Sequence, residues 1–97
     1  MHIMPHSIAK STPRFSDRVR RLIYQANYTG MRETDLLLRH FAKVYLPYLN
    51  DSDLTDFENL LAAGDSLLYA WLTGNATVPE VYDTNVFNLI KKYKYTL

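Results

Sequence analysis

Apolar residues recur every three or four positions in five short segments of this chain, and glycine or proline interrupts the pattern between most of them. This spacing places apolar side chains on one face of an α-helix. No segment shows sustained alternation of apolar and polar residues with the two-residue period of a strand. The chain is therefore predicted to be all-α, a compact five-helix bundle that forms a single small domain.

Residues that start and stop helices bound each segment. Ser, Asn, Asp and Thr side chains can cap the first turn of a helix, whereas glycine ends helices and proline disfavours helix before it. Thr29 is expected to cap the second helix, and Asp65 the fourth. The predicted helices run from Ser16-Asp17 to about Tyr28, from Thr29-Gly30 to about Leu46, from Asn50-Asp51 to Gly64, from Asp65 to Gly74, and from Asp83 or Thr84 through Tyr93.

The apolar faces of these helices predict the core. Leu67-Leu68 and Trp71-Leu72 could instead form an exposed docking patch, but so short a helix is expected to bury both pairs. The other predicted core residues are Val19, Leu22, Ile23, Ala26, Leu37, Leu38, Phe41, Val44, Tyr45, Tyr48, Leu54, Phe57, Leu61, Val86, Leu89, Ile90 and Tyr93.

The length of 97 residues suffices for one hydrophobic core. We expect residues 16–97 to form the helical domain and residues 1–15, which contain Pro5 and Pro13, to form a flexible N-terminal arm. No apolar run approaches the roughly 20 residues that span a bilayer, so no direct membrane insertion is expected. The absence of cysteine excludes disulfides, thiolate metal sites and a cysteine nucleophile.

The net charge is only +1, but the charges are unevenly distributed. Arg14, Arg18 and Arg21 have the spacing of one helical side and could contact phosphates. An acidic block from Asp51 to Glu58 would oppose a nucleic-acid backbone. We therefore interpret the basic side as solvated surface and expect no nucleic-acid partner, although a small nucleic-acid-binding protein stays an alternative.

The sequence contains none of the local motifs of phosphate loops, dinucleotide sites, nucleophile elbows or paired-histidine zinc sites. His40 lies on the polar side of the second helix and is interpreted as a surface histidine. Glu33 and Asp35 are two residues apart, so they point in different directions and form no catalytic dyad. In the first turn of a helix their charge is favourable by about 0.3–1 kcal/mol. We expect no catalytic residues and no bound metal.

Several stretches together resemble the SdhE family of FAD assembly factors for succinate dehydrogenase. The similar stretches are Arg21 to Gln25, Gly30 to Leu38, Phe41-Ala42, Phe57 to Leu61 and Trp71 to Gly74. The resemblance covers roughly residues 16–93, in order, and ends with an amphipathic helix. Members of this family are small five-helix bundles, in agreement with the architecture predicted above.

The resemblance implies a protein that binds the flavoprotein subunit of succinate dehydrogenase, with fumarate reductase as a second candidate. It also implies that the chain promotes covalent attachment of FAD to a histidine of that subunit. Such a chain is a chaperone-like assembly factor and no enzyme. We expect it to be a monomer, to bind no FAD itself, and to act on FAD that the partner holds.

The family signature is an Arg-Gly pair followed, after two residues, by Glu. Gly30 and Glu33 match this signature, whereas Thr29 stands where arginine is usual and Tyr28 where a basic residue is frequent. Arg32, about one turn away, is predicted to supply the missing charge. Glycine permits both a turn and a close approach by a partner backbone. The resemblance implies a partner-binding site formed by Thr29, Gly30, Met31, Arg32, Glu33 and Asp35.

Two further points stay open on the sequence alone. An antitoxin-like or other protein-interaction regulator could use the same surface. The short segment before the first helix favours a bacterial cytoplasmic protein, with the mitochondrial matrix as the alternative.

Overall fold

The computed structural model describes residues 13–27 and 32–94, and for residues 32–35 and 94 it describes the backbone alone. Across these two ranges the chain forms five α-helices and two short 3-10 helices, and no strand. The predicted all-α architecture is confirmed. The elements are α2 (Asp17–Asn27), α3 (Arg32–Tyr45), η1 (Leu46–Tyr48), α4 (Asp51–Ala63), α5 (Asp65–Thr73), η2 (Glu80–Tyr82) and α6 (Asn85–Lys94).

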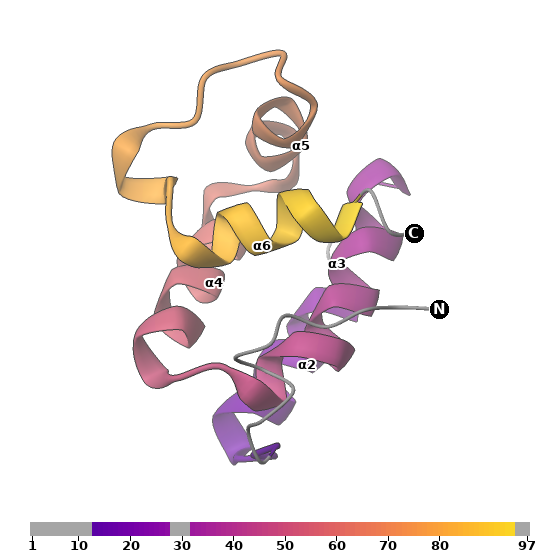
Figure 1. The fold of residues 1–97 in the computed structure, drawn as a ribbon. Coiled ribbons are helices and arrows are strands. Elements are labelled where there is room, and N and C mark those ends of the chain that lie inside the picture. The colour runs from indigo at the N-terminus through magenta and orange to yellow at the C-terminus, as the bar shows by residue number, and fades with distance from the viewer. Residues whose placement is uncertain (1–12, 28–31, 95–97) are drawn as a thin grey trace.

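Helix α3 packs against α2, α5 and α6, and α4 packs against α5 and α6 (Figure 1). Helices α2 and α3 run side by side, and α6 contacts both α3 and α4. Helices α3 and α4 each contact three other helices, since α4 also contacts α2, and together they connect the bundle. The N-terminal turn of α3 follows the link from α2 and therefore belongs to a helix that packs against three others.

An aromatic cluster fills the centre of the bundle. Phe41 stacks on Tyr45 with ring centroids 4.7 Å apart and lies 6.0 Å from Phe57, which belongs to α4. The ring of Tyr93, from α6, meets Phe41 edge-on at 5.9 Å and Tyr45 at 5.6 Å. Edge-on and offset rings at these separations contribute about 0.5–1.5 kcal/mol beyond burial of their area. The cluster joins three helices that are far apart in the sequence.

Nearly all predicted core residues lie in the core or against it. Ile23, Val44, Tyr48, Leu61 and Leu89 are partly buried and pack on the others. Leu67 is different, since 51% of its surface is exposed, so the expectation that the Leu67-Leu68 pair is buried is wrong for its first member. The fully enclosed residues include Ala42, Leu46, Leu60 and Phe87, which the periodicity did not single out.

Three of the predicted caps are present. The Oγ of Ser16 accepts the backbone N–H of Val19 at 3.2 Å, and Asn50 Oδ1 accepts that of Asp53 at 2.8 Å. Thr84 Oγ1 accepts the N–H of Phe87 at 3.2 Å, which identifies Thr84 as the cap of α6. Each such cap stabilises a helix by about 0.5–2 kcal/mol.

The predicted cap at Asp65 is wrong. Gly64 occupies the N-cap position of α5, without a side-chain bond, and Asp65 is the first residue of the helix. Gly64 has φ +102° and ψ 150°, a backbone conformation that is essentially restricted to glycine. One residue therefore ends α4 and starts α5, and no space is left for a separate cap. The predicted cap Thr29 lies outside the described residues.

Both prolines that follow a predicted helix region sit at short 3-10 helices. Pro47 lies inside η1, directly after α3, and Pro79 precedes η2. Tyr82 of η2 stacks on Trp71 with centroids 4.9 Å apart, so the link between α5 and α6 is held against α5. Within the described ranges, none of the helices has the length and apolarity that crossing a membrane requires.

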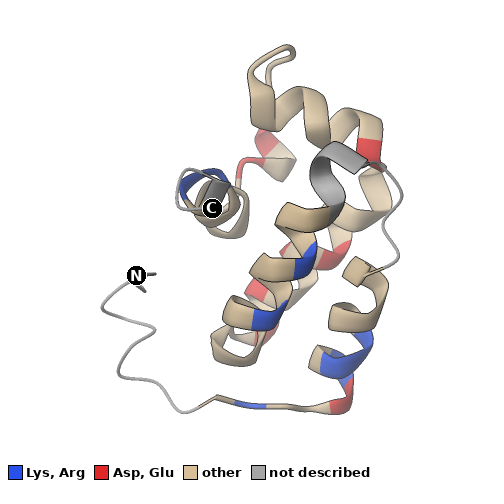
Figure 2. Ribbon diagram, turned by 90° about the vertical axis from the view of Figure 1, so that its right-hand side faces the viewer, with Lys and Arg blue, Asp and Glu red and all other residues tan. Residues whose placement is uncertain are grey.

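Charge divides the bundle into regions. Figure 2 shows lysine and arginine positions on the neighbouring helices α2 and α3. Helix α4 instead carries the acidic block, with Asp51, Asp53, Asp56 and Glu58 among its 13 residues. Burial raises the pKa of the Asp53 carboxyl above its usual value, and the neighbouring Asp56 adds to this effect, whereas a hydrogen bond from Asn85 opposes it.

Candidate functional site

The candidate site lies at the junction between α2 and α3. Thr29, Gly30 and Met31 fall outside the described residues, so their predicted role stays a prediction. Arg32, Glu33 and Asp35 occupy the first turn of α3, as expected for Glu33 and Asp35. Acidic residues are favoured in the first turn of a helix, because the positive end of the helix dipole lies there.

Burial of one face of each helix positions the junction. Helix α2 buries Val19, Leu22 and Ala26, and α3 buries Leu37 and Leu38 one turn after the candidate residues. Both apolar faces join the same core cluster. The helices on both sides of the junction are consequently packed into one core.

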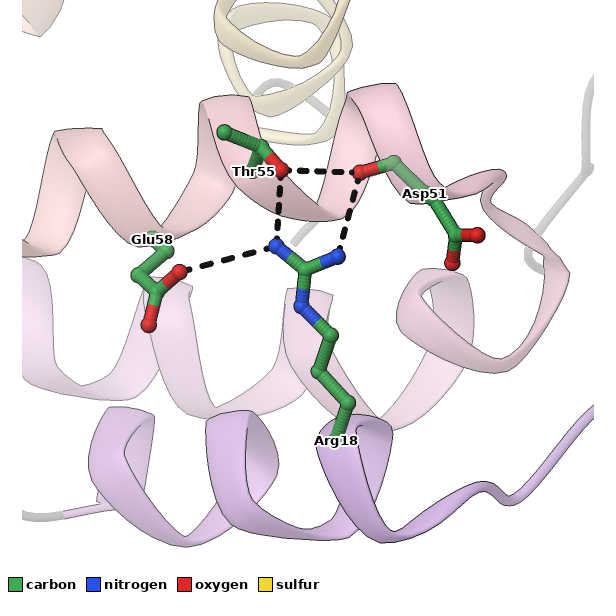
Figure 3. A network of polar contacts seen from close by, with 4 residues as sticks. All are labelled: Arg18, Asp51, Thr55 and Glu58. Carbon is green, nitrogen blue, oxygen red and sulfur yellow. Dashed lines mark hydrogen bonds and ion pairs between the residues drawn. The ribbon is translucent and has the colours of Figure 1, made fainter.

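A polar network fixes α2 to α4 (Figure 3). The guanidinium of Arg18 donates to the carbonyl oxygen of Asp51 at 3.3 Å and to Thr55 Oγ1 at 2.7 Å. It also pairs with Glu58 at 3.5 Å. Side chains at this site are partly exposed, so the ion pair contributes at most about 1 kcal/mol. The main effect of this network is to hold α2 in a fixed orientation against α4.

This network corrects the expectation that Arg14, Arg18 and Arg21 share one solvated side. Arg14 precedes α2, where its backbone N–H donates to the carbonyl of Pro47 at 2.6 Å and its guanidinium to that of Leu49 at 2.9 Å. Arg18 turns to α4, and Arg21 alone of the three is an exposed helical residue without such contacts. The three arginines therefore form no common phosphate-binding side.

Two large apolar side chains near the junction are exposed. Tyr24 on α2 is 63% exposed and Leu36 on α3 is 54% exposed. Neither was predicted to belong to the site. The sequence pattern does indicate that both are exposed. Tyr24 lies outside the buried stripe of α2, and Leu36 precedes the buried stripe of α3 that begins at Leu37. Exposed apolar residues beside a candidate site are typical of protein–protein contacts.

Asn27, the last residue of α2, has a buried side-chain oxygen. Its Oδ1 has no hydrogen-bond partner among the residues that the structure describes. A buried polar atom without a partner costs about 1–3 kcal/mol, and native proteins keep few of them. Local departures from the rules of stability are expected at functional positions, and this one directly precedes the candidate residues.

Away from the junction, the described residues include an exposed histidine and a small cavity. His40 is exposed, as predicted, on the outer side of α3. Within residues 13–27 and 32–94 no group of three or more histidine, aspartate or glutamate side chains could hold a metal ion. A cavity of about 70 Å³ is lined by Arg14, Ser16, Val19, Asp51 and Leu54. It lies at the end of α2 remote from the junction and is smaller than the roughly 300–1,000 Å³ of typical ligand pockets.

Comparison with known proteins connects this arrangement to a family. A family model described as "flavinator of succinate dehydrogenase" matches residues 20–94. The matched segment includes the junction, most of α2 and the whole of α3 to α6.

Curated proteins with related sequences are named mitochondrial succinate dehydrogenase assembly factor 2. The chain is 36% identical to the protein of Dictyostelium discoideum over 74 residues, which is 76% of this chain and 52% of that protein. The protein of Schizosaccharomyces japonicus is 39% identical over 74 residues, 75% of this chain and 52% of its own length. For Danio rerio the values are 34% over 76 residues, 76% and 48%. The chain thus spans about half the length of the curated relatives it matches.

Proposed function

Because the chain belongs to the family of flavinators of succinate dehydrogenase, we propose that it is an assembly factor for that enzyme. In this role it binds the flavoprotein subunit of succinate dehydrogenase and promotes covalent attachment of FAD to it. The observation that carries the proposal is the family match over residues 20–94, because this segment contains the candidate junction and the helices that hold it.

The chain contributes binding and positioning. A histidine of the flavoprotein subunit and the flavin methyl carbon supply the covalent chemistry. Holding two reacting groups in the correct geometry can account for several kcal/mol of an activation barrier. The first turn of α3 suits this task, since α3 packs against three other helices. The chain is accordingly a helper and no enzyme.

The candidate residues have different roles in binding. Gly30 allows the partner backbone to come close, and Glu33 offers a carboxylate to a donor or cation of the partner. Arg32 takes the place of the family arginine that Thr29 replaces. The chain acts as a monomer, binds no FAD by itself and meets FAD already held by the flavoprotein subunit. The names of the relatives favour the mitochondrial matrix over a bacterial cytoplasm as the compartment.

Co-purification tests the partner. The tagged chain is expressed together with the flavoprotein subunit of succinate dehydrogenase from the same organism, and the captured subunit is quantified. We expect a one-to-one complex by light scattering. The exposed Glu80, which lies in η2 and outside the proposed site, supplies the control variant Glu80→Ala, for which the same yield is expected. Failure of the wild-type chain to capture the subunit contradicts the proposal.

The same experiment separates the other candidate functions. Capture of a toxin from a native extract, without the flavoprotein subunit, supports an antitoxin-like regulator. A nucleic-acid-binding role has lost part of its basis, because Arg14 and Arg18 bond to groups of this chain. A nucleic-acid-binding protein would shift the gel mobility of generic duplex DNA in a salt-dependent way. The assembly-factor proposal predicts no such shift.

A further inference from the structure

The outward sides of α2 and α3 carry two kinds of exposed residue, apolar and basic. On each helix, residues three or four apart lie on the same side. Tyr24 and Leu36 are each about one turn from the end of the helix that faces the junction, and basic residues follow farther away. We call this surface the α2–α3 face. Its exposed members are Arg20, Arg21 and Tyr24 of α2 and Leu36, His40 and Lys43 of α3.

The cations of this face do not serve the fold. No ion pair or hydrogen bond within the described chain engages the side chains of Arg20, Arg21 or Lys43, in contrast to Arg18, which bonds to α4. Figure 2 shows that basic positions of α2 and α3 lie on adjacent helices. Asp17 is the one acid among the exposed described residues of these two helices. Asp17 lies one turn before Arg20 and Arg21 and offsets part of their charge, so the exposed described residues of the two helices keep a net positive charge.

We propose that the α2–α3 face is a docking surface for an acidic region of the flavoprotein subunit. The apolar side chains Tyr24 and Leu36 meet an apolar patch of the partner, and carboxylates of the partner lie opposite Arg20, Arg21 and Lys43. This inference rests on the proposed function, and it extends the contact from the junction along both helices. The charge of the face determines the chemistry of the occupant, since complementary potentials favour encounter and fix orientation.

The composition of the face favours a protein partner over a nucleic acid. Its cations are few, and a largely exposed leucine beside them gains nothing from a phosphate backbone but loses contact with water when it meets an apolar protein surface. The acidic block of α4, next to α2, would repel an extended polyanion but leaves room for a compact acidic patch.

The salt dependence of binding to the purified flavoprotein subunit distinguishes the contribution of the charged residues of the face from that of its apolar residues. For the double variant Arg20→Gln, Arg21→Gln we expect affinity about ten-fold weaker at 50 mM NaCl and within about two-fold of wild type at 1 M, where charges are screened beyond roughly 3 Å. For Leu36→Gln we expect a loss of about five- to ten-fold that is similar at both concentrations, because an apolar contact is not screened.

A matched control changes the net charge by the same amount at a different place. Asn75 and Thr77 are exposed in the link between α5 and η2, so Asn75→Asp, Thr77→Glu changes the charge by the same two units away from the face. Its affinity should stay within about two-fold of wild type. All variants change exposed residues, and thermal unfolding checks that each is folded.

The inference is overturned if the arginine variant binds like the wild type at low salt, or if the loop control weakens binding equally. It is also overturned if generic duplex DNA displaces the flavoprotein subunit. In each of these cases the wild-type chain still binds the subunit in the absence of DNA, so the proposed function stands. If the wild-type chain does not bind the subunit at all, the proposed function itself fails.

Discussion

Glu33 is the residue on which structural and functional roles can be separated most clearly. It lies in the first turn of α3, where a negative charge is worth only about 0.3–1 kcal/mol to the helix. We predict that Glu33→Ala lowers the free energy of unfolding by no more than this amount but abolishes support of flavinylation. Thermal unfolding measures the first effect, and in-gel fluorescence of covalent flavin measures the second. Wild-type levels of covalent flavin with the variant would count against the assigned site.

Phe41 is the opposite case, a residue whose role is structural. Its side chain is fully enclosed and contacts rings from three helices. We predict that Phe41→Ala lowers the free energy of unfolding by about 3–5 kcal/mol, because it removes buried area and leaves a cavity. Urea unfolding measures this change. The control Tyr24→Ala, at a residue with 63% exposure, should change stability by less than about 1 kcal/mol. Equal costs for the two variants would contradict the described core.

At the scale of the helix, the glycines that end α4 and α5 make a direct comparison possible. Gly64 has φ +102° and ψ 150°, and Gly74 has φ +80° and ψ 7°. A Cβ added at either position would meet no atom within 4 Å, so substitution costs only backbone strain. The region of Gly64 is essentially closed to other residues, whereas that of Gly74 is the left-handed region.

We therefore predict that Gly64→Ala costs about 2–3 kcal/mol and Gly74→Ala about 1 kcal/mol, both measured by urea unfolding. Asparagine tolerates the left-handed region better than alanine does, so Gly74→Asn should cost less than Gly74→Ala. A cost for Gly64→Ala no larger than that for Gly74→Ala would show that the chain between α4 and α5 has a different backbone conformation.

The helices were the part of the fold that the sequence predicted best, and local physics explains why. Each is defined by its own apolar stripe, and the caps Ser16, Asn50 and Thr84 act within three residues. The prediction failed at Asp65, where two helices share one residue at their ends. The 3-10 helices were missed because proline shows that an α-helix ends but does not say which structure follows.

At the scale of the whole molecule, prediction was limited by contacts between distant residues. Arg18 was expected on a solvated side but bonds to residues 33 to 40 positions later in the chain. Leu67 was expected in the core but is half exposed. The surroundings of these two side chains depend on how the helices pack against one another, and a periodic pattern in the sequence carries no information on that packing. For the candidate site, the sequence placed Glu33 and Asp35 in a first helical turn, but it did not identify the exposed Tyr24 and Leu36.

The packed interior should also give the molecule a specific response to alkali. Burial raises the pKa of the Tyr45 and Tyr93 hydroxyls above the usual 10.0, and for Tyr45 the nearby Tyr93 adds to the effect. Above pH 10 the unfolded chain therefore loses these protons before the folded chain does. The stability that the neutral hydroxyls contribute is fully present below pH 10 and is lost as pH rises through the higher folded-state pKa.

We predict that the unfolding temperature falls more steeply between pH 10 and pH 11.5 for the wild type than for the double variant Tyr45→Phe, Tyr93→Phe. Circular dichroism at several pH values measures both slopes. The control Tyr24→Phe, Tyr69→Phe changes two tyrosines outside the aromatic cluster and should keep the wild-type slope. If the core variant loses stability as steeply as the wild type, these hydroxyls are not the cause.

The central claim is that this small helical chain enables another protein to acquire covalent flavin. The most direct test incubates the purified apo-flavoprotein subunit of succinate dehydrogenase with FAD, with and without this chain, and follows covalent flavin by in-gel fluorescence. We predict that covalent flavin accumulates much faster with the wild-type chain than without it, and that Glu33→Ala at the same concentration gives no acceleration. Equal accumulation with and without the wild-type chain would contradict the account.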